Sequence, residues 1–102
     1  MSVLKINNEN FELVKSSEKP VLLDFYADWC GPCRMLSPVV DAIAEEREDI
    51  LVGKINVDEN AELASKFGVV SIPTLIVMKN GEVVNRSMGA RPKSQVLALL
   101  EA

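Results

Sequence analysis

The only two cysteines of the chain are Cys30 and Cys33, which enclose Gly31-Pro32 and follow the only tryptophan, Trp29. If a helix begins at or just after Cys30, both thiols lie on one helical face, close enough for their sulfurs to bond. A cysteine at a helix N-terminus is stabilised as a thiolate by free N–H groups and the helix dipole. The spacing therefore allows thiol-disulfide exchange, with Cys30 better placed to attack and Cys33 expected to be less exposed.

Two other uses of the cysteine pair are open on spacing alone. A disulfide that closes so short a loop constrains the unfolded chain little, so it would be a poor structural staple. Structural zinc is usually held by four cysteine or histidine side chains, and the chain has two cysteines and no histidine. Gly31 permits a tight turn, and Pro32 suits the first turn of a helix. A redox pair without a bound metal is favoured.

Length and composition predict one domain over residues 1–102, large enough to bury a modest core. Hydrophobic residues make up 48% and charged residues 25%, which argues against disorder and against a membrane protein. The net charge of −4 disfavours unassisted binding to nucleic acid. No apolar run reaches the length of a signal peptide or membrane span. We expect a cytoplasmic protein, and in a reducing cytosol such cysteines are more often catalytic than structural.

The hydrophobic pattern predicts the order β-α-β-α-β-α-β-β-α. Strands are predicted over residues 3–6, 21–27, 50–57, 74–79 and 82–88. Helices are predicted after a cap at Asn7 or Asn8, from Pro32 to about Glu48, after a cap at Asp58, and from Pro92. Asn80-Gly81 predicts a two-residue hairpin, so the sheet turns antiparallel there. The turn at Cys30 then lies at the carboxyl end of a central strand, where open α/β sheets place active sites.

Two charged residues occupy strand positions that look buried. Asp24 interrupts the apolar strand 21–27, and burial there should raise the pKa of its carboxyl. Lys54 occupies an interior-looking position of the strand 50–57. It is expected either to face Asp24 across the sheet or to extend its ammonium to the surface.

Four motifs resemble those of the thioredoxin family, and together they span essentially the whole chain. They are Asp24-Phe25-Tyr26-Ala27-Asp28-Trp29-Cys30-Gly31-Pro32-Cys33, Ile72-Pro73-Thr74, Lys79-Asn80-Gly81-Glu82 and Gly89-Ala90. Trp-Cys-Gly-Pro-Cys is far more specific than a bare Cys-x-x-Cys. The resemblance implies the α/β thioredoxin fold, a mixed five-stranded sheet flanked by four helices.

The resemblance also implies roles for individual residues. Cys30 would attack the target disulfide, and Cys33 would resolve the mixed disulfide that forms. Asp24 would take the proton from Cys33 during resolution, which suits a carboxyl with a raised pKa. Pro73 would follow a cis peptide bond and lie beside the disulfide, leaving the neighbouring backbone free to pair with an extended target segment. We therefore expect the catalytic residues to be Cys30, Cys33, Asp24, Lys54 and Pro73.

Around Cys30 we expect an apolar docking rim, formed by Trp29, Val70, Ile72, Gly89 and Ala90. Trp29, Gly31 and Pro32 also make up the active-site turn. Exposed apolar groups beside a reactive centre suggest a broad protein-docking surface with little side-chain specificity. Val70 stands where relatives often carry a polar or basic residue, which bears on which targets or which reductase dock best.

The resemblance, together with the chemistry of the cysteine pair, implies a protein-disulfide reductase that acts as an electron carrier. Its partners would be disulfide-containing proteins and a thioredoxin reductase, with no nucleic acid and no membrane, and the protein would be a monomer. No cofactor would be bound, and NADPH would be used only through the reductase. Two alternatives stay open: a disulfide oxidase or isomerase of the same fold, and a binding subunit that uses the rim without redox turnover. Oxidases and isomerases usually carry other residues in place of Gly31-Pro32.

Overall fold

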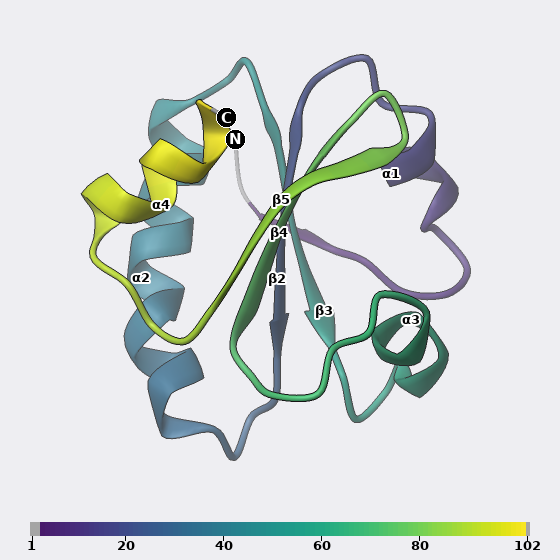
Figure 1. Ribbon diagram of the computed structural model, residues 1–102, viewed down its shortest axis with the longest axis vertical. Coiled ribbons are helices and arrows are strands. Elements are labelled where there is room, and N and C mark those ends of the chain that lie inside the picture. The colour runs from purple at the N-terminus through teal and green to yellow at the C-terminus, as the bar shows by residue number, and fades with distance from the viewer. Residues whose placement is uncertain (1–2, 102) are drawn as a thin grey trace.

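The structure is a computed structural model that describes residues 3–101, so residues 1, 2 and 102 of the expected domain lie outside the described part. The order of elements is the predicted one (Figure 1). The elements are β1 (Leu4–Lys5), α1 (Glu12–Lys15), β2 (Val21–Tyr26), α2 (Gly31–Glu46), β3 (Leu51–Asn56), α3 (Ala61–Lys66), β4 (Thr74–Lys79), β5 (Glu82–Met88) and α4 (Lys93–Leu100).

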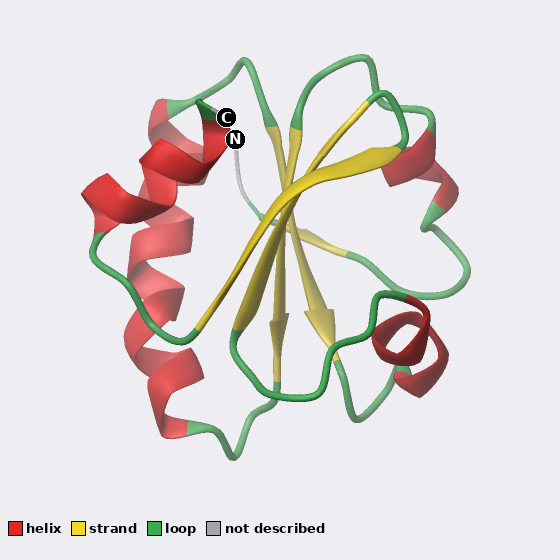
Figure 2. Ribbon diagram, in the orientation of Figure 1, coloured by secondary structure: helices red, strands yellow, loops and turns green. Residues whose placement is uncertain are grey.

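The five strands form one mixed sheet in the order β1-β3-β2-β4-β5. Strands β1, β3 and β2 are parallel, whereas β4 runs antiparallel to β2 and β5 antiparallel to β4. Helices α2 and α4 cover one face of the sheet, and α1 and α3 cover the other (Figures 1 and 2). The expected thioredoxin fold, with four helices flanking a mixed five-stranded sheet, is confirmed.

Strand β2 lies in the middle of the sheet and is buried on both faces. Its neighbouring residues Leu22 and Leu23 are both fully buried, but they pack in different apolar clusters on opposite faces of the sheet. This explains why the strand is a nearly unbroken apolar run rather than an alternating one. Its carboxyl end leads directly into the turn that carries the cysteines.

The hairpin between β4 and β5 forms at Asn80-Gly81, as predicted. Both residues have positive φ angles, 54° for Asn80 and 80° for Gly81, which is the backbone of a type I′ turn. Gly68, with a φ of 66°, follows the end of α3. Glycine adopts such angles without the steric cost that a Cβ imposes.

The predicted helix caps are wrong for the two short helices. Asn7 Oδ1 accepts the N–H groups of Glu9 and Asn10 at 2.9 Å each, so it closes a turn ahead of α1, and α1 itself begins after Phe11. Helix α3 begins after Asn60 rather than after Asp58. A polar residue ahead of a helix can satisfy turn N–H groups as well as helical ones, so its position alone did not distinguish the two. Within residues 3–101, no helix is long and apolar enough to cross a membrane.

Candidate active site

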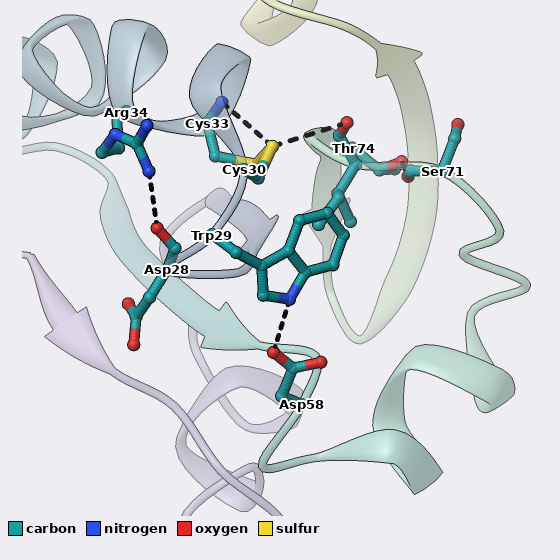
Figure 3. The surroundings of a disulfide bond; sticks show 9 residues. Asp28, Trp29, Cys30, Cys33, Arg34, Asp58, Ser71 and Thr74 are labelled. Carbon is teal, nitrogen blue, oxygen red and sulfur yellow. Dashed lines mark hydrogen bonds between the residues drawn. A yellow bond between two sulfur atoms is a disulfide. The ribbon is translucent and has the colours of Figure 1, made fainter.

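The turn after β2 places both cysteines at the start of α2. Cys30 is the N-cap residue with an extended backbone, and Gly31 and Pro32 form the first helical positions. The two cysteines form a disulfide, with Cα atoms 5.2 Å apart (Figure 3). The Cys33 N–H donates to Cys30 Sγ at 3.2 Å, so the first sulfur takes the role that a serine or aspartate oxygen has at other helix starts. The predicted helix start at Cys30 is confirmed.

The two cysteines differ in position rather than in exposure. The residues are 4% and 3% exposed, so the expected lower exposure of Cys33 amounts to almost nothing in the disulfide form. Cys30 Sγ accepts the Cys33 N–H at the start of α2 and lies 3.9 Å from the carbonyl oxygen of Ile72. The helix start therefore favours negative charge on Cys30 rather than on Cys33.

Asp24 is fully buried beneath this turn, as expected. Among the described residues, neither of its carboxylate oxygens has a hydrogen-bond partner. Burial raises the pKa of the Asp24 carboxyl from 3.8 to about 6, because the charged form loses its solvation; Lys54 partly opposes this rise and Asp41 adds to it. A carboxyl with such a pKa can change its protonation state near neutral pH.

Lys54 lies directly opposite Asp24 in the register of β2 and β3. Its ammonium does not pair with that carboxylate: Nζ donates to Ser37 Oγ at 2.8 Å and lies 4.7 Å from the centre of the Tyr26 ring. The two sequence expectations for Lys54 are thus both met in part, since the residue faces Asp24 while its half-buried side chain extends outward.

Beside the disulfide lies a hollow of about 230 Å³, whose lining includes Cys33, Ser37 and Lys54. Ser37 was not singled out from the sequence. The signal was present, because Ser37 follows Cys33 by four residues and therefore lies on the same face of α2. Ser37 and Lys54 supply polar groups to the hollow, which is large enough to hold water next to Cys33.

The loop before β4 lies against the disulfide from the other side. The Ile72-Pro73 peptide bond is cis, as the resemblance implied, and Pro73 is buried. The Gly89 N–H donates to the Pro73 carbonyl at 2.8 Å, which ties the end of β5 to this loop. Ile72 packs with both cysteines in one small apolar cluster.

Three of the five residues expected to form a docking rim are exposed, and another exposed apolar side chain, Met88, lies next to them in the chain. Trp29 is 68% and Val70 91% exposed, Ala90 is exposed, and Ile72 and Gly89 are partly buried. Met88, which was missed, is 56% exposed, and its Sδ lies 3.3 Å from Ser71 Oγ in the loop before Ile72. Its position next to Gly89 could have revealed it.

Asp58 also has a different role from the predicted one. Instead of capping a helix, its Oδ2 accepts the indole N–H of Trp29 at 2.8 Å (Figure 3). The two residues are far apart in the chain, and no local pattern reveals their contact. Within residues 3–101 no group of three or more cysteine, aspartate, glutamate or histidine side chains is arranged to hold a metal ion.

The thioredoxin family model matches residues 2–102 of the chain. The chain is 52% identical over 102 residues to a thioredoxin of Porphyra purpurea, covering 98% of this chain and 95% of that protein. It is 48% identical over 101 residues to a thioredoxin of Bacillus subtilis (strain 168), covering 98% and 96%. Its structure matches a mutant thioredoxin from Halobacterium salinarum NRC-1 with a TM-score of 0.90 and 44% identity, over 98% of this chain and 88% of that one.

These similarities extend over nearly the full length of the chain. The structure also contains a disulfide within the Cys-Gly-Pro-Cys turn. Neither a binding subunit without redox turnover nor an oxidase or isomerase is favoured. The chain therefore belongs to the thioredoxin family and is a thiol-disulfide oxidoreductase of the protein-disulfide reductase type, with a redox-active disulfide between Cys30 and Cys33.

Proposed function

We propose that the protein passes electrons from a thioredoxin reductase to disulfide-containing proteins, with Cys30 as the attacking thiolate. The Cys30 thiolate attacks one sulfur of the target disulfide, forms a mixed disulfide and releases the first target thiolate. Cys33 then loses its proton and attacks Cys30 Sγ, which restores the Cys30–Cys33 disulfide and releases the second target thiolate. The observation that carries this proposal is the N–H of Cys33, which donates to Cys30 Sγ at the start of α2.

We assign the proton acceptor for Cys33 to Asp24, acting through water. A carboxyl with a pKa of about 6 is largely ionised at neutral pH yet holds a proton more readily than an exposed one. The hollow beside Cys33 also reaches Lys54, which lies opposite Asp24 in the sheet. Lys54 would then lower the cost of the Asp24 charge and help to order the water.

Target proteins would dock on the rim of Trp29, Val70, Ile72, Met88, Gly89 and Ala90. The Ile72 carbonyl lies next to Cys30 Sγ, so a target segment paired with this backbone would bring its disulfide to the nucleophile. Pro73 would hold the loop in place through its carbonyl, which accepts the Gly89 N–H at 2.8 Å. The rim is mostly apolar, which suits many different targets.

The whole chain, residues 1–102, would act as one domain and as a monomer in the cytoplasm. It would need no bound cofactor and would draw on NADPH only through the reductase. It would bind neither nucleic acid nor membranes, which agrees with its net charge of −4.

Reduction of insulin disulfides tests the main claim. With dithiothreitol, or with a thioredoxin reductase and NADPH, the protein should accelerate the precipitation of the insulin B chain. The Cys30→Ser variant serves as the matched control and should give only the background rate. A wild-type rate equal to that background would overturn the proposal.

Alkylation of the reduced protein tests which cysteine attacks. Near pH 7, iodoacetamide should label Cys30 first, because the helix start stabilises its thiolate. The labelled residue is identified by mass spectrometry of the protease fragments. Preferential labelling of Cys33 would reverse the two assignments.

A further inference from the structure

An open groove of about 580 Å³ lies between β5 and α4, outside the disulfide site. Ala98 and Leu99 of α4 and Met88 of β5 form its apolar part. Ser87, Gln95 and Arg91 supply polar groups, and Arg86 completes the lining. None of these residues, all within the described part of the chain, is acidic. The groove therefore combines an apolar surface with positive charge.

The guanidinium of Arg91 is held at this groove by three uncharged hydrogen-bond acceptors. Its Nε donates to Ser87 Oγ, its Nη1 to Gln95 Oε1 at 3.3 Å, and its Nη2 to the Met88 carbonyl at 3.4 Å. A guanidinium has five N–H groups, so these contacts leave two without an acceptor. Among residues 3–101, no carboxylate forms an ion pair with Arg91. The cation is thus held in position but not neutralised.

The groove is continuous with the docking rim. Met88 and Arg91, which both line the groove, directly flank the rim residues Gly89 and Ala90. The Gly89 N–H donates a hydrogen bond to the Pro73 carbonyl beside the disulfide. From Gly89 the chain continues to the start of α4 (Figure 1). A protein docked at Cys30 across Gly89 and Ala90 therefore reaches the groove with its neighbouring residues.

We propose that this groove receives an acidic side chain of the protein being reduced, whose carboxylate accepts the two remaining N–H groups of Arg91. The proposal rests on the proposed function and adds a preference to it: disulfides flanked by glutamate or aspartate are reduced faster than those flanked by lysine. An arginine that is already positioned loses less conformational freedom on binding, and its planar fork matches a carboxylate. Because the whole chain carries a net charge of −4, this attraction is local and opposes the long-range field.

Matched peptide disulfides test the preference. The peptides are identical except for one residue, which is glutamate, glutamine or lysine and is moved through successive positions on either side of the disulfide. The pre-reduced protein is mixed with each peptide, and the emission of Trp29, the only tryptophan, reports the second-order rate constant. At its best position, the glutamate peptide should react about two- to fivefold faster than the lysine peptide at low ionic strength. High salt should bring the ratio towards one.

Substitutions at Arg91 decide whether the groove is responsible. Arg91→Gln should bring the ratio of the glutamate-peptide rate to the lysine-peptide rate to about one. Arg91→Glu should make the lysine peptide the faster one. Lys15→Gln is the matched control, because it removes one positive charge on α1, across the sheet from α4 (Figure 1), and should leave the ratio unchanged. Since both peptides are measured on the same variant, a loss of folded protein cancels from the ratio.

Several outcomes would overturn the proposal. One is a rate ratio that stays unchanged in Arg91→Gln. Another is a loss of the glutamate preference in Lys15→Gln that is as large as in Arg91→Gln. The third is a faster reaction of the lysine peptide with the wild-type protein. A dimer in sedimentation that Arg91→Glu dissociates would show that a second copy fills the groove instead. Failure of the wild-type protein to reduce even the glutamine peptide would count against the proposed function itself, so the two failures are distinguishable.

Discussion

The turn from β2 to α2 and the turn from β3 to α3 both follow parallel strands at the same edge of the sheet, yet they treat buried polar groups differently. At the β3–α3 turn, Asn56 and Asn60 are buried and hydrogen-bonded. Asn56 Oδ1 accepts the Asp58 N–H at 2.9 Å, Asn60 Nδ2 donates to the Asn56 carbonyl at 3.0 Å, and Asn60 Oδ1 accepts the Asn8 N–H at 3.2 Å. Beneath the β2–α2 turn, both oxygens of Asp24 lack such partners among the described residues.

The buried amides of the β3–α3 turn stabilise the backbone, whereas the buried carboxyl of Asp24 can gain and lose a proton. A buried amide that is hydrogen-bonded to the backbone stabilises a turn and offers no group that gains or loses a proton near neutral pH. A buried carboxyl without hydrogen bonds is costly when charged, and the rise of its pKa from 3.8 to about 6 corresponds to about 3 kcal/mol. That cost is tolerable where the group must gain and lose a proton.

Removal of the resolving thiol should have the largest effect. Cys33→Ser should reduce the turnover of insulin at least about 1,000-fold, because the mixed disulfide at Cys30 has no second thiol to release it. Non-reducing electrophoresis should show the protein trapped on its target. Full turnover in this variant would mean that resolution does not need Cys33. The matched change on the scaffold side, Asn60→Ala, should leave turnover intact in the folded protein.

Asp24→Asn should stabilise the disulfide form in a pH-dependent way. The folded pKa lies above the unfolded value, so ionisation costs free energy only in the folded protein, and this penalty develops between about pH 4 and pH 6. The variant should gain about 2–3 kcal/mol of unfolding free energy at pH 8, and little of that gain should remain at pH 4. Urea unfolding at both pH values measures it. A gain that is equal at both pH values would refute the assignment to ionisation.

The same variant should slow one chemical step only. Without the carboxylate, Asp24→Asn should release the mixed disulfide about 100-fold more slowly near pH 7, the lower end of the usual contribution of one general base. Formation of the mixed disulfide should keep its wild-type rate. Rapid acid quenching followed by mass spectrometry separates the two steps, and equal slowing of both would count against Asp24 as the base for Cys33.

On the scaffold side, Asn56→Ala should lower stability without touching the chemistry. The change leaves the Asp58 N–H without its acceptor, which should cost about 1–2 kcal/mol of unfolding free energy. Because no titration is involved, the loss should be the same at pH 4 and pH 8. Its insulin reduction rate per folded molecule should match the wild type. A lowered rate would show that the β3–α3 turn also serves the reaction.

Asp58→Ala should give the smallest effect. Trp29 is exposed, so water can replace the lost hydrogen bond, and stability should change by less than about 0.5 kcal/mol. The fluorescence of Trp29 should change, because its indole N–H loses a carboxylate partner, while the kcat/KM for insulin should fall by less than about threefold. Asp28→Ala, which leaves the indole contact intact, is the control. An unchanged spectrum would mean that the contact is absent in solution.

The comparison of the two turns also shows how far a sequence can be interpreted. The helix predicted from Pro32 implied that both cysteines lie at its start, and the apolar run 21–27 predicted a buried strand with Asp24 inside it. Asn80-Gly81 predicted the hairpin, since few residues tolerate positive φ. Each of these depends on residues that are close in the chain. The caps at Asn7 or Asn8 and Asp58 were predicted wrongly, because the same polar residues satisfy turns as readily as helices.

Local sequence patterns were enough to predict the order of the elements, the cysteine pair at the start of α2 and a buried carboxyl on the strand that precedes it. These follow from backbone preferences and side-chain periodicity, which act over a few residues. The fold brings the Lys54 ammonium to Ser37 rather than to Asp24, and the Asp58 carboxylate to the Trp29 indole, and neither contact was predicted. The fold also places Arg91 at a groove beside the rim. Such contacts join distant segments, so they depend on strand register and helix packing, which no local pattern specifies.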